Sequence, residues 1–421
     1  SFQDAFSIIA KKISASAADE CAFFAGAGLT NEEMFLLRKL SGVINTPNLD
    51  SFHYLNRGKG YINASENSLP LNDLSLSDSC FVFGANLFRS NHSAGFRIFN
   101  SIFRRGIPMT FITVEGEKMM ERRASACIRI SSFYSFVKAV NKYIIVNSLY
   151  NRVFIDSRCE GFDNYVNDLA KEDFEALVKK SGTDRDTVVG FAEKFCDSLR
   201  PALLFTEEDI DSATAAEIRN LSLIAGKTGK TGSGTICLKE CSNSQGIIDL
   251  NIHNDNTLSL LKSGNLKTML IINEDPLGCA VDHKEVKKLL SGADFMIVQD
   301  YFMTETAQQA DIVLPSTFIF ETGGSFTSCR KAINVTDAGI TGPVEVGGCG
   351  QIAALMVEMG CDQVSSPDEI RDEYLSGIRS QSDKLSIELV PYNSSEHKIF
   401  NHGCNSFLRL FDEQISRGRM L

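Results

Sequence analysis

Short apolar runs alternate with amphipathic stretches along most of this sequence. The runs have the length of β-strands and are rich in Phe, Ile, Leu and Val: CAFFAGAG (21–28), SCFVFGAN (79–86), PMTFITVEG (108–116), RPALLFTEED (200–209), KTMLIINEDP (267–276) and ADFMIVQD (293–300). The helix-like stretches between them lie near 30–42, 93–105, 212–225 and 281–291. Strands that alternate with helices predict parallel, doubly wound α/β sheets.

The helix expected after the first run has clearly marked ends. Thr30 or Asn31 can accept a hydrogen bond from the free backbone N–H groups at its start. Glu32 and Glu33 suit the first turn, where the helix dipole favours negative charge. Gly42 is the residue at which we expect this helix to end.

Two parts of the sequence share one plan. In the first, a strand ends at Gly84–Asn86, a helix follows, and the next strand ends before Glu115. In the second, a strand ends at Asn273–Pro276, a helix follows, and the next strand ends at Asp300. Ligands of open α/β sheets lie outside the carboxyl ends of the strands, where an acid commonly holds a ribose or a base. The pattern predicts two Rossmann-like halves around one ligand, although either asparagine, taken alone, could simply turn the chain.

Composition limits the class of protein. The 421 residues, 43% of them hydrophobic, suffice for more than one domain. The net charge of −11 disfavours binding to nucleic acid, because phosphates require a basic face. No stretch approaches the roughly 20 apolar residues of a membrane span, and the start of the chain does not match a signal peptide. We therefore expect a cytoplasmic protein that does not span a membrane.

The 12 cysteines and six histidines predict no metal ligands. No two cysteines form a C-x-x-C pair, and even the closest two, Cys237 and Cys241, are too widely spaced for a zinc knuckle or a ferredoxin-type cluster. The histidines form no H-x-x-x-H pair. Buried free thiols in a reducing compartment are the simpler interpretation.

The stretch VQDYFMTETAQQADIVLPSTFIFETGGSFTS (298–328) resembles the signature of the molybdopterin oxidoreductases, the family of formate dehydrogenase and dimethyl-sulfoxide reductase. Other segments resemble formate dehydrogenase in the same order along the chain: TNEEMFLLRKLSG, NTPNLDS, FGANLFRSNH, NSQGIIDLN and NEDP. The resemblance covers roughly residues 3–360. It is closest in kind to the molybdopterin-type domain of the large iron–sulfur subunit of respiratory complex I.

The resemblance implies an α/β fold of two Rossmann-like doubly wound parallel-sheet domains, lacking the iron–sulfur domain and most of the carboxyl-terminal barrel domain. One half would comprise 1–60 and 200–360, with the signature at 267–330, and the other half 61–199. Residues 361–421 would be a linker and a carboxyl-terminal docking segment.

The resemblance also implies a pocket for the guanosine end of a pterin dinucleotide. Asp300 would accept hydrogen bonds from guanine N–H groups, and Thr304 and Glu305 would reach the ligand from the next loop. The complete set of expected cofactor-binding residues is Gly84, Asn86, Glu115, Gln245, Asn273, Asp275, Asp300, Thr304 and Glu305.

The sequence departs from the family at the metal. No set of cysteines supplies the family's iron–sulfur motif. Asn56 and Arg57 stand where formate dehydrogenases have a Cys or selenocysteine followed by His, and an amide binds molybdenum poorly. A shifted alignment would offer Ser51, with His53 nearby. We therefore predict no catalytic residue and no metal ligand.

The sequence also departs at the phosphates. The family's D-P-R-x-T is here Val114–Lys118, so that Glu115 could replace the Asp, but the arginine is missing and Glu117 adds an acid. Asp275 replaces an asparagine of the family's G-E-N-P. Added carboxylates repel an anionic cofactor.

Two functional hypotheses follow. The first is a degenerate domain that binds no cofactor and serves as a structural part of a complex resembling NADH dehydrogenase, hydrogenase or formate dehydrogenase, with iron–sulfur and flavin subunits or domains as partners. The alternative is a catalytic fragment, similar to formate dehydrogenase, that binds molybdopterin guanine dinucleotide. A plain NAD-type binding protein is disfavoured, because no strand is followed by G-x-G-x-x-G.

Overall fold

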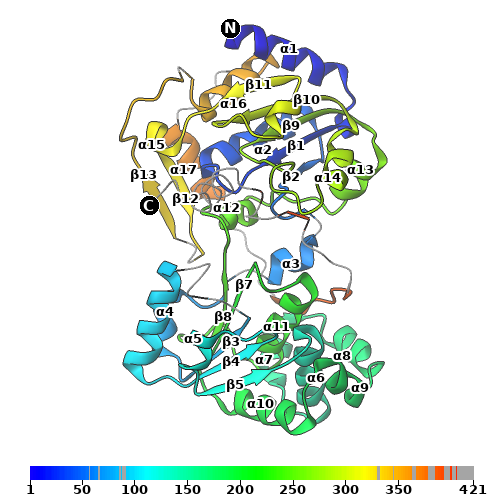
Figure 1. Ribbon diagram of the computed structural model, residues 1–421, viewed down its shortest axis with the longest axis vertical. Coiled ribbons are helices and arrows are strands. Elements are labelled where there is room, and N and C mark those ends of the chain that lie inside the picture. The colour runs from blue at the N-terminus through cyan, green and yellow to red at the C-terminus, as the bar shows by residue number, and fades with distance from the viewer. Residues whose placement is uncertain are drawn as a thin grey trace. The chain divides into compact units, whose positions relative to one another are not determined.

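The computed structural model describes residues 1–55, 57–64, 67–84, 87, 92–329, 332–344, 346–362, 367–377, 385–392, 399–400 and 404. The chain divides into two compact units (Figure 1). The first unit comprises 1–58, 241–381 and 397–421, and the second unit comprises 59–240 and 382–396. Each contains a parallel five-stranded sheet with helices, which confirms the predicted α/β fold of Rossmann-like units.

The sheet of the first unit has the strand order β11-β10-β9-β1-β2, with all neighbours parallel. Its strands are β1 (Cys21–Ala25), β2 (Leu49–Asp50), β9 (Leu266–Ile272), β10 (Ala293–Asp300) and β11 (Ile312–Pro315). In its register, Phe24 is opposite Asp50 on one side and Ile271 on the other. All five strands therefore end at the same edge of the sheet.

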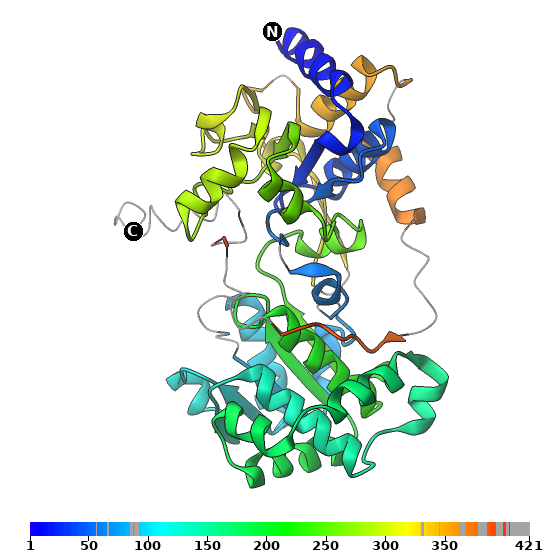
Figure 2. The ribbon, with the colours of Figure 1, turned by 90° about the vertical axis from the view of Figure 1, so that its right-hand side faces the viewer.

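Helices cover both faces of this sheet. The helices of this unit are α1 (Phe2–Ala15), α2 (Asn31–Ile44), α12 (Ser244–Asp249), α13 (Thr257–Ser263), α14 (His283–Leu290), α15 (Ile319–Thr322), α16 (Gly348–Glu358) and α17 (Pro367–Gly377), with 3-10 turns η1 (Ala18–Glu20) and η3 (Ala307–Gln309). Helix α2 contacts α16 and α17, and Figure 2 shows α17, in orange, beside α2. Helices α13 and α14 contact each other and contribute to the core on the opposite face.

Alternation along the strands explains this double layer. Every second residue, such as Met269 and Ile271 in β9, joins a core cluster with Leu261 of α13 and Val286 of α14. The intervening Leu270 is also buried and points to the other face. Strands buried on both faces read as continuous apolar runs, which is the pattern that the sequence shows.

Helix α2 starts as predicted but ends later. Thr30 and Glu33 form a reciprocal capping box, in which the Thr30 side chain accepts from Glu33 N at 3.2 Å and the Glu33 side chain accepts from Thr30 N at 2.9 Å. The helix does not end at Gly42 but continues to Ile44. Asn45 then takes a left-handed conformation with φ 59° and terminates it.

The sheet of the second unit has the order β5-β4-β3-β7-β8 and is also parallel. Its strands are β3 (Ser79–Phe83), β4 (Met109–Thr113), β5 (Ala126–Arg129), β7 (Pro201–Thr206) and β8 (Gly234–Leu238). Its helices are α3 (Gly58–Ala64), η2 (Leu71–Leu76), α4 (His92–Arg105), α5 (Lys118–Glu121), α6 (Phe133–Val146), α7 (Arg152–Arg158), α8 (Phe162–Ala170), α9 (Phe174–Ser181), α10 (Arg185–Asp197) and α11 (Ser212–Ile224).

In the described part of the chain, two short strand pairs lie outside the two five-stranded sheets. In the first unit, β12 (Gly324–Thr327) and β13 (Ile333–Thr336) form an antiparallel hairpin. In the second, β14 (Leu385–Ser386) pairs in parallel with β6 (Cys159–Glu160). The segment expected as a linker and docking element therefore adds α17 to the first unit and β14 to the second.

The division between the units differs from the expected one. The sequence placed 200–240 with the first half, whereas β7 and β8 lie in the second sheet, where β7 pairs with β3. The chain therefore returns to the first unit at 241 and not at 200. The physical reason is that β7 satisfies its backbone hydrogen bonds with the free side of β3, and β8 with β7.

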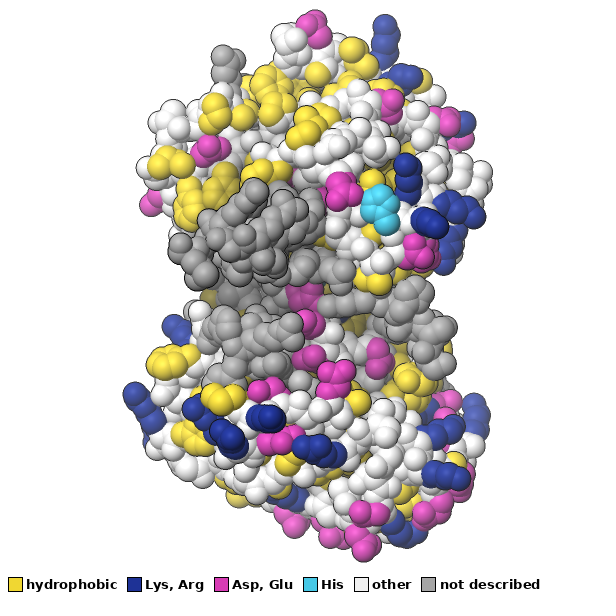
Figure 3. Space-filling model, in the orientation of Figure 1, with side chains coloured by type: hydrophobic (Ala, Val, Ile, Leu, Met, Phe, Trp, Pro, Cys, Tyr) yellow, Lys and Arg dark blue, Asp and Glu magenta, His cyan; other side chains and the backbone are white. Residues whose placement is uncertain are grey.

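Among the described residues, no helix is both long and apolar enough to cross a bilayer. On the face that Figure 3 shows, acidic and basic side chains are interspersed over both units.

Candidate functional site

Polar residues gather where the strands of the first unit end. Directly after, or at the ends of, β1, β2, β9, β10 and β11 lie side chains that are mostly buried: Thr30, Asn31, Asp50, Ser51, His53, Asn273, Glu274, Asp275, Gln299, Asp300, Thr304, Thr306 and Ser316. Buried polar groups are costly unless they find partners. This carboxyl edge is therefore the candidate site of the unit.

Asn273 follows β9 in a strained conformation. Its φ is 56°, and its backbone N–H donates to the Gln299 carbonyl at 2.8 Å. The Oδ1 atom of Asn273 is buried and has no hydrogen-bond partner among the described residues. The Asn273 carbonyl also touches Gly26, in the loop after β1. A Cβ added to Gly26 would lie 2.0 Å from the Asn273 carbonyl oxygen. Only glycine at position 26 permits this approach.

Glu274 is fully buried and holds the loop after β2. Its carboxylate accepts from Ser51 Oγ at 2.8 Å, Phe52 N at 3.1 Å and His53 N at 3.2 Å. Burial raises the pKa of Glu274 to about 8, although these hydrogen bonds lower it. His53 Nε2 lies 3.0 Å from Ser244 Oγ. The side chains of Ser51 and His53, which a shifted alignment would offer to a metal, are thus engaged within the protein.

Asp275 organises the loop between β10 and β11. Its Oδ1 accepts from Thr306 N at 3.0 Å, Thr306 Oγ1 at 2.7 Å and Gly278 N at 3.1 Å. Thr304 Oγ1 accepts from Ala307 N at 3.0 Å in the same loop. The small polar groups that follow β10 therefore fold this loop back against the one that follows β9.

Asp300 and Glu305 lie in different surroundings. Asp300 ends β10, is 2% exposed, and accepts from Phe302 N through Oδ1 at 3.0 Å. Glu305 is half-exposed, and its Oε2 lies 3.0 Å from His283 Nε2 at the start of α14. Asp300 is thus inside the edge and Glu305 at its rim.

Gln245, on α12, is fully buried. Its Nε2 donates to Asp249 at 2.9 Å, while its Oε1 has no partner within the described part of the chain. The neighbouring Asn243 donates to the Leu29 carbonyl at 2.7 Å and accepts from Thr327 N at 2.8 Å. Asn243 therefore joins α12, the loop after β1 and the hairpin.

The remaining expected residues belong to the second unit. Gly84 follows β3 with φ 69°, and Glu115 is exposed after β4. Asn86 lies outside the described residues. Local patterns gave no signal for the buried pair at the ends of β7 and β8, where Lys239 Nζ lies 3.2 Å from Glu207 Oε1.

The first unit thus brings five of the expected residues to the carboxyl edge of its sheet: Asn273, Asp275, Asp300, Thr304 and Glu305. Gln245 belongs to the same unit but lies on α12. Sequence reasoning missed two others there. Glu274 is the second residue of the segment NEDP, and Gln299 directly precedes Asp300. Gln299 Nε2 is buried with no partner in the residues that the structure describes.

These atoms test whether the edge fits a pterin cofactor. The buried atoms without partners include two acceptors, Asn273 Oδ1 and Gln245 Oε1, and one donor, Gln299 Nε2. Within the described ranges, no three His, Cys, Asp or Glu side chains converge on a point that could hold a metal ion.

Comparison with known proteins agrees with this geometry. The family model described as molybdopterin oxidoreductase matches residues 1–346. The probable oxidoreductase YjgC of Bacillus subtilis is 28% identical over 79% of this chain and 39% of its own length. The alpha subunit of the F420-dependent formate dehydrogenase of Methanocaldococcus jannaschii is 26% identical over 78% of this chain and 55% of its own.

A solved structure shares the fold. Acetylene hydratase from Pelobacter acetylenicus superposes with a TM-score of 0.66 at 16% identity, covering 86% of this chain and 58% of that one. The chain therefore spans between about two fifths and three fifths of the length of these proteins.

Proposed function

The chain belongs to the molybdopterin oxidoreductase family, and from this premise we propose that it is a degenerate member with a structural role in an electron-transfer complex. The family implies a molybdopterin cofactor, and the formate dehydrogenase-like relatives are oxidoreductases. Here, however, Ser51 and His53, which a shifted alignment would offer to the metal, have partners within the protein, and Asn56 lies outside the described residues.

The observation that carries this proposal is the engagement of Ser51 and His53. Ser51 Oγ donates to Glu274, and His53 Nε2 contacts Ser244 Oγ. To bind a metal, Ser51 would have to leave a buried partner. Leaving a buried carboxyl without its donors is costly, so these bonds favour a closed loop over a metal site.

Charge supports the same proposal. Asp50, Asp275 and Asp300 place three nearly inaccessible carboxyl groups at one edge. A pterin dinucleotide brings two phosphates, whose charge is repelled most strongly where water is excluded. The partners that we propose are iron–sulfur and flavin subunits of a complex resembling NADH dehydrogenase, hydrogenase or formate dehydrogenase.

A second function is favoured by the unpaired atoms. Asn273 Oδ1 and Gln299 Nε2 would gain partners from a guanine or pterin ring, and Asp300 would accept from guanine N–H groups. In this alternative the chain is a formate dehydrogenase-like fragment that holds molybdopterin guanine dinucleotide. The bound group would supply the redox chemistry, and these residues would position its nucleotide end.

The content of pterin distinguishes the two. The full chain would be purified from cells that make the cofactor, oxidised, and assayed for pterin fluorescence and for guanine released by acid. The structural proposal predicts neither compound, together with co-purification of iron–sulfur or flavin proteins. One pterin and one guanine per chain would instead support the second function and contradict the first.

A further inference from the structure

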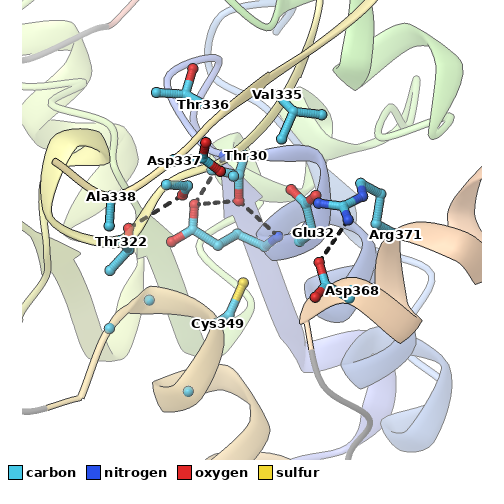
Figure 4. A pocket seen from close by; sticks show the side chains of 16 residues that line it. Thr30, Glu32, Thr322, Val335, Thr336, Asp337, Ala338, Cys349, Asp368 and Arg371 are labelled. Carbon is cyan, nitrogen blue, oxygen red and sulfur yellow. Dashed lines mark hydrogen bonds and ion pairs between the residues drawn. The ribbon is translucent and has the colours of Figure 1, made fainter.

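A pocket of about 350 Å³ lies in the first unit beside the amino-terminal ends of α2 and α16. The hairpin β12–β13 and the start of α17 complete its walls (Figure 4). The charged and reactive side chains that line it are Glu32, Glu33, Asp337, Cys349, Asp368 and Arg371. None of them belongs to the residues assigned above to the pterin cofactor.

Glu32 is the residue that indicates a ligand. It is 2% exposed, and its Oε2 accepts from Ser325 N at 2.9 Å, which ties α2 to the hairpin. Its Oε1 is buried and has no hydrogen-bond partner among the described residues. A carboxylate oxygen that is shielded from water and unpaired carries a large penalty, which a donor group in the pocket would remove.

Glu33 and Cys349 do not compete with Glu32 for a hydrogen-bond donor in the pocket. Both contacts of Glu33 Oε2 are with Thr30, from N at 2.9 Å and from Oγ1 at 2.9 Å. Glu33 Oε1 faces Gly348, where an added Cβ would lie 1.9 Å away. Burial raises the pKa of Cys349, and the nearby Glu33 and Glu32 raise it further, so the thiol stays neutral.

The charge of the lining is negative overall. Among the described residues that line the pocket, Arg371 is the one base, and its guanidinium lies 2.6 Å from Asp368 Oδ1. Asp337 is exposed at the rim. The acids do not converge into a three-ligand cluster anywhere in the described part of the chain, so the geometry suits an organic cation better than a metal ion.

We propose that this pocket binds a small organic cation through its guanidinium or primary ammonium group, with Glu32 as the counter-ion. The donor N–H groups of such a cation satisfy Glu32 Oε1 and add a charge-assisted hydrogen bond. The volume is at the lower end of the range for small-molecule sites and admits one such group with a short alkyl chain. The cation comes either from a free amine or from a basic side chain of a polypeptide.

The test is calorimetric titration of the full chain with two probes. Agmatine represents the free cation, and a blocked Gly-Arg-Gly peptide represents a basic side chain. Glu32→Gln keeps an acceptor oxygen for Ser325 N but removes the charge, and we expect it to weaken binding of the tighter probe by about tenfold or more. Glu193→Gln removes the same charge from the second unit and should leave binding unchanged.

Each outcome has one meaning. Tighter binding of agmatine assigns a free small molecule, and tighter binding of the peptide assigns a polypeptide side chain. Failure of both probes to bind at millimolar concentration, or equal binding by wild type and Glu32→Gln, overturns the proposal. If Glu32→Gln does not fold, Asp337→Asn at the rim replaces it, with an expected loss of about threefold, and an unchanged affinity in that variant overturns the proposal equally.

Discussion

Glu274 ties the loop after β9 to the loop after β2, and its proton should make stability depend on pH. Burial raises its pKa to about 8 from an ordinary 4.5. Between these values the folded protein holds a proton that the unfolded protein releases. The stability associated with protonated Glu274 is therefore fully present below about pH 4.5 and is lost as the pH rises through 8.

Glu274→Gln removes this titration. Relative to the variant, the free energy of unfolding of the wild type should fall between about pH 5 and pH 8, by up to about 1.4 kcal/mol per pH unit. Urea unfolding at several pH values measures the difference, and Glu193→Gln serves as the control. A difference that stays constant across this range would show that Glu274 is ionised throughout.

Substitutions at Asn273 measure how much its left-handed backbone conformation costs in stability. Its φ of 56° is tolerated by Asn and free of strain only for Gly. Asn273→Ala and Asn273→Gly both remove the unpaired Oδ1. The difference in stability between the two variants therefore reports the strain of the backbone conformation. We expect the Ala variant to be less stable than the Gly variant by about 1 kcal/mol in urea unfolding. Equal stability would mean that the loop relaxes.

At this scale the sequence predicted part of the site. Asp300, Asp275 and Asn273 follow strands, and the common edge of a parallel sheet brings such residues together. The partners of each side chain could not be predicted, because they come from distant loops: Glu274 binds the backbone of 52–53, and Asp275 binds Thr306. Which atoms stay unpaired, such as Gln299 Nε2, follows only from that packing.

At the scale of elements, local signals predicted β1, β3, β4, β7, β9 and β10 and the helices α2, α4, α11 and α14, but not β5, β8 or the helices α6 to α10. The capping box of α2 illustrates why, since Thr30 and Glu33 lie three positions apart and meet without help from the rest of the fold. The pairing of β7 with β3 illustrates the opposite. Nothing near 201–206 distinguishes a strand of one sheet from a strand of the other, so the expected boundary at 199–200 differed from the structure.

The cap of α2 should contribute measurably to stability. Thr30→Ala removes the acceptor of Glu33 N and the donor to Glu33 Oε2, and we expect a loss of about 1 kcal/mol in the free energy of unfolding. Thr30→Ser keeps the hydroxyl and should recover most of this loss. Equal losses in both variants would assign the effect to packing of the Thr30 methyl group.

At the scale of the molecule, each unit has its own sheet and its own core, so damage to one should leave the other intact. Lys138, in the second unit, is largely buried and lies 3.3 Å from Asp168 and 3.2 Å from Glu172. Lys138→Met leaves these partly exposed carboxylates without their cation. We expect the free energy of unfolding to fall by about 1–3 kcal/mol, less than for a fully buried ion pair, because solvent screens the partly exposed carboxylates.

Hydrogen exchange measured by mass spectrometry locates this effect. Exchange should accelerate in α6, α8 and α11 of the Lys138→Met variant, while β1, β9 and β10 should exchange as in the wild type. Acceleration in both sheets would show that the two units unfold as one.

The central claim is that this family member has kept the fold and lost the metal. The most direct test is the molybdenum and tungsten content of the purified full chain, measured by mass spectrometry beside a formate dehydrogenase relative produced in the same cells. We predict metal near one per chain in the relative and only traces in this protein. One molybdenum or tungsten per chain here would contradict the claim.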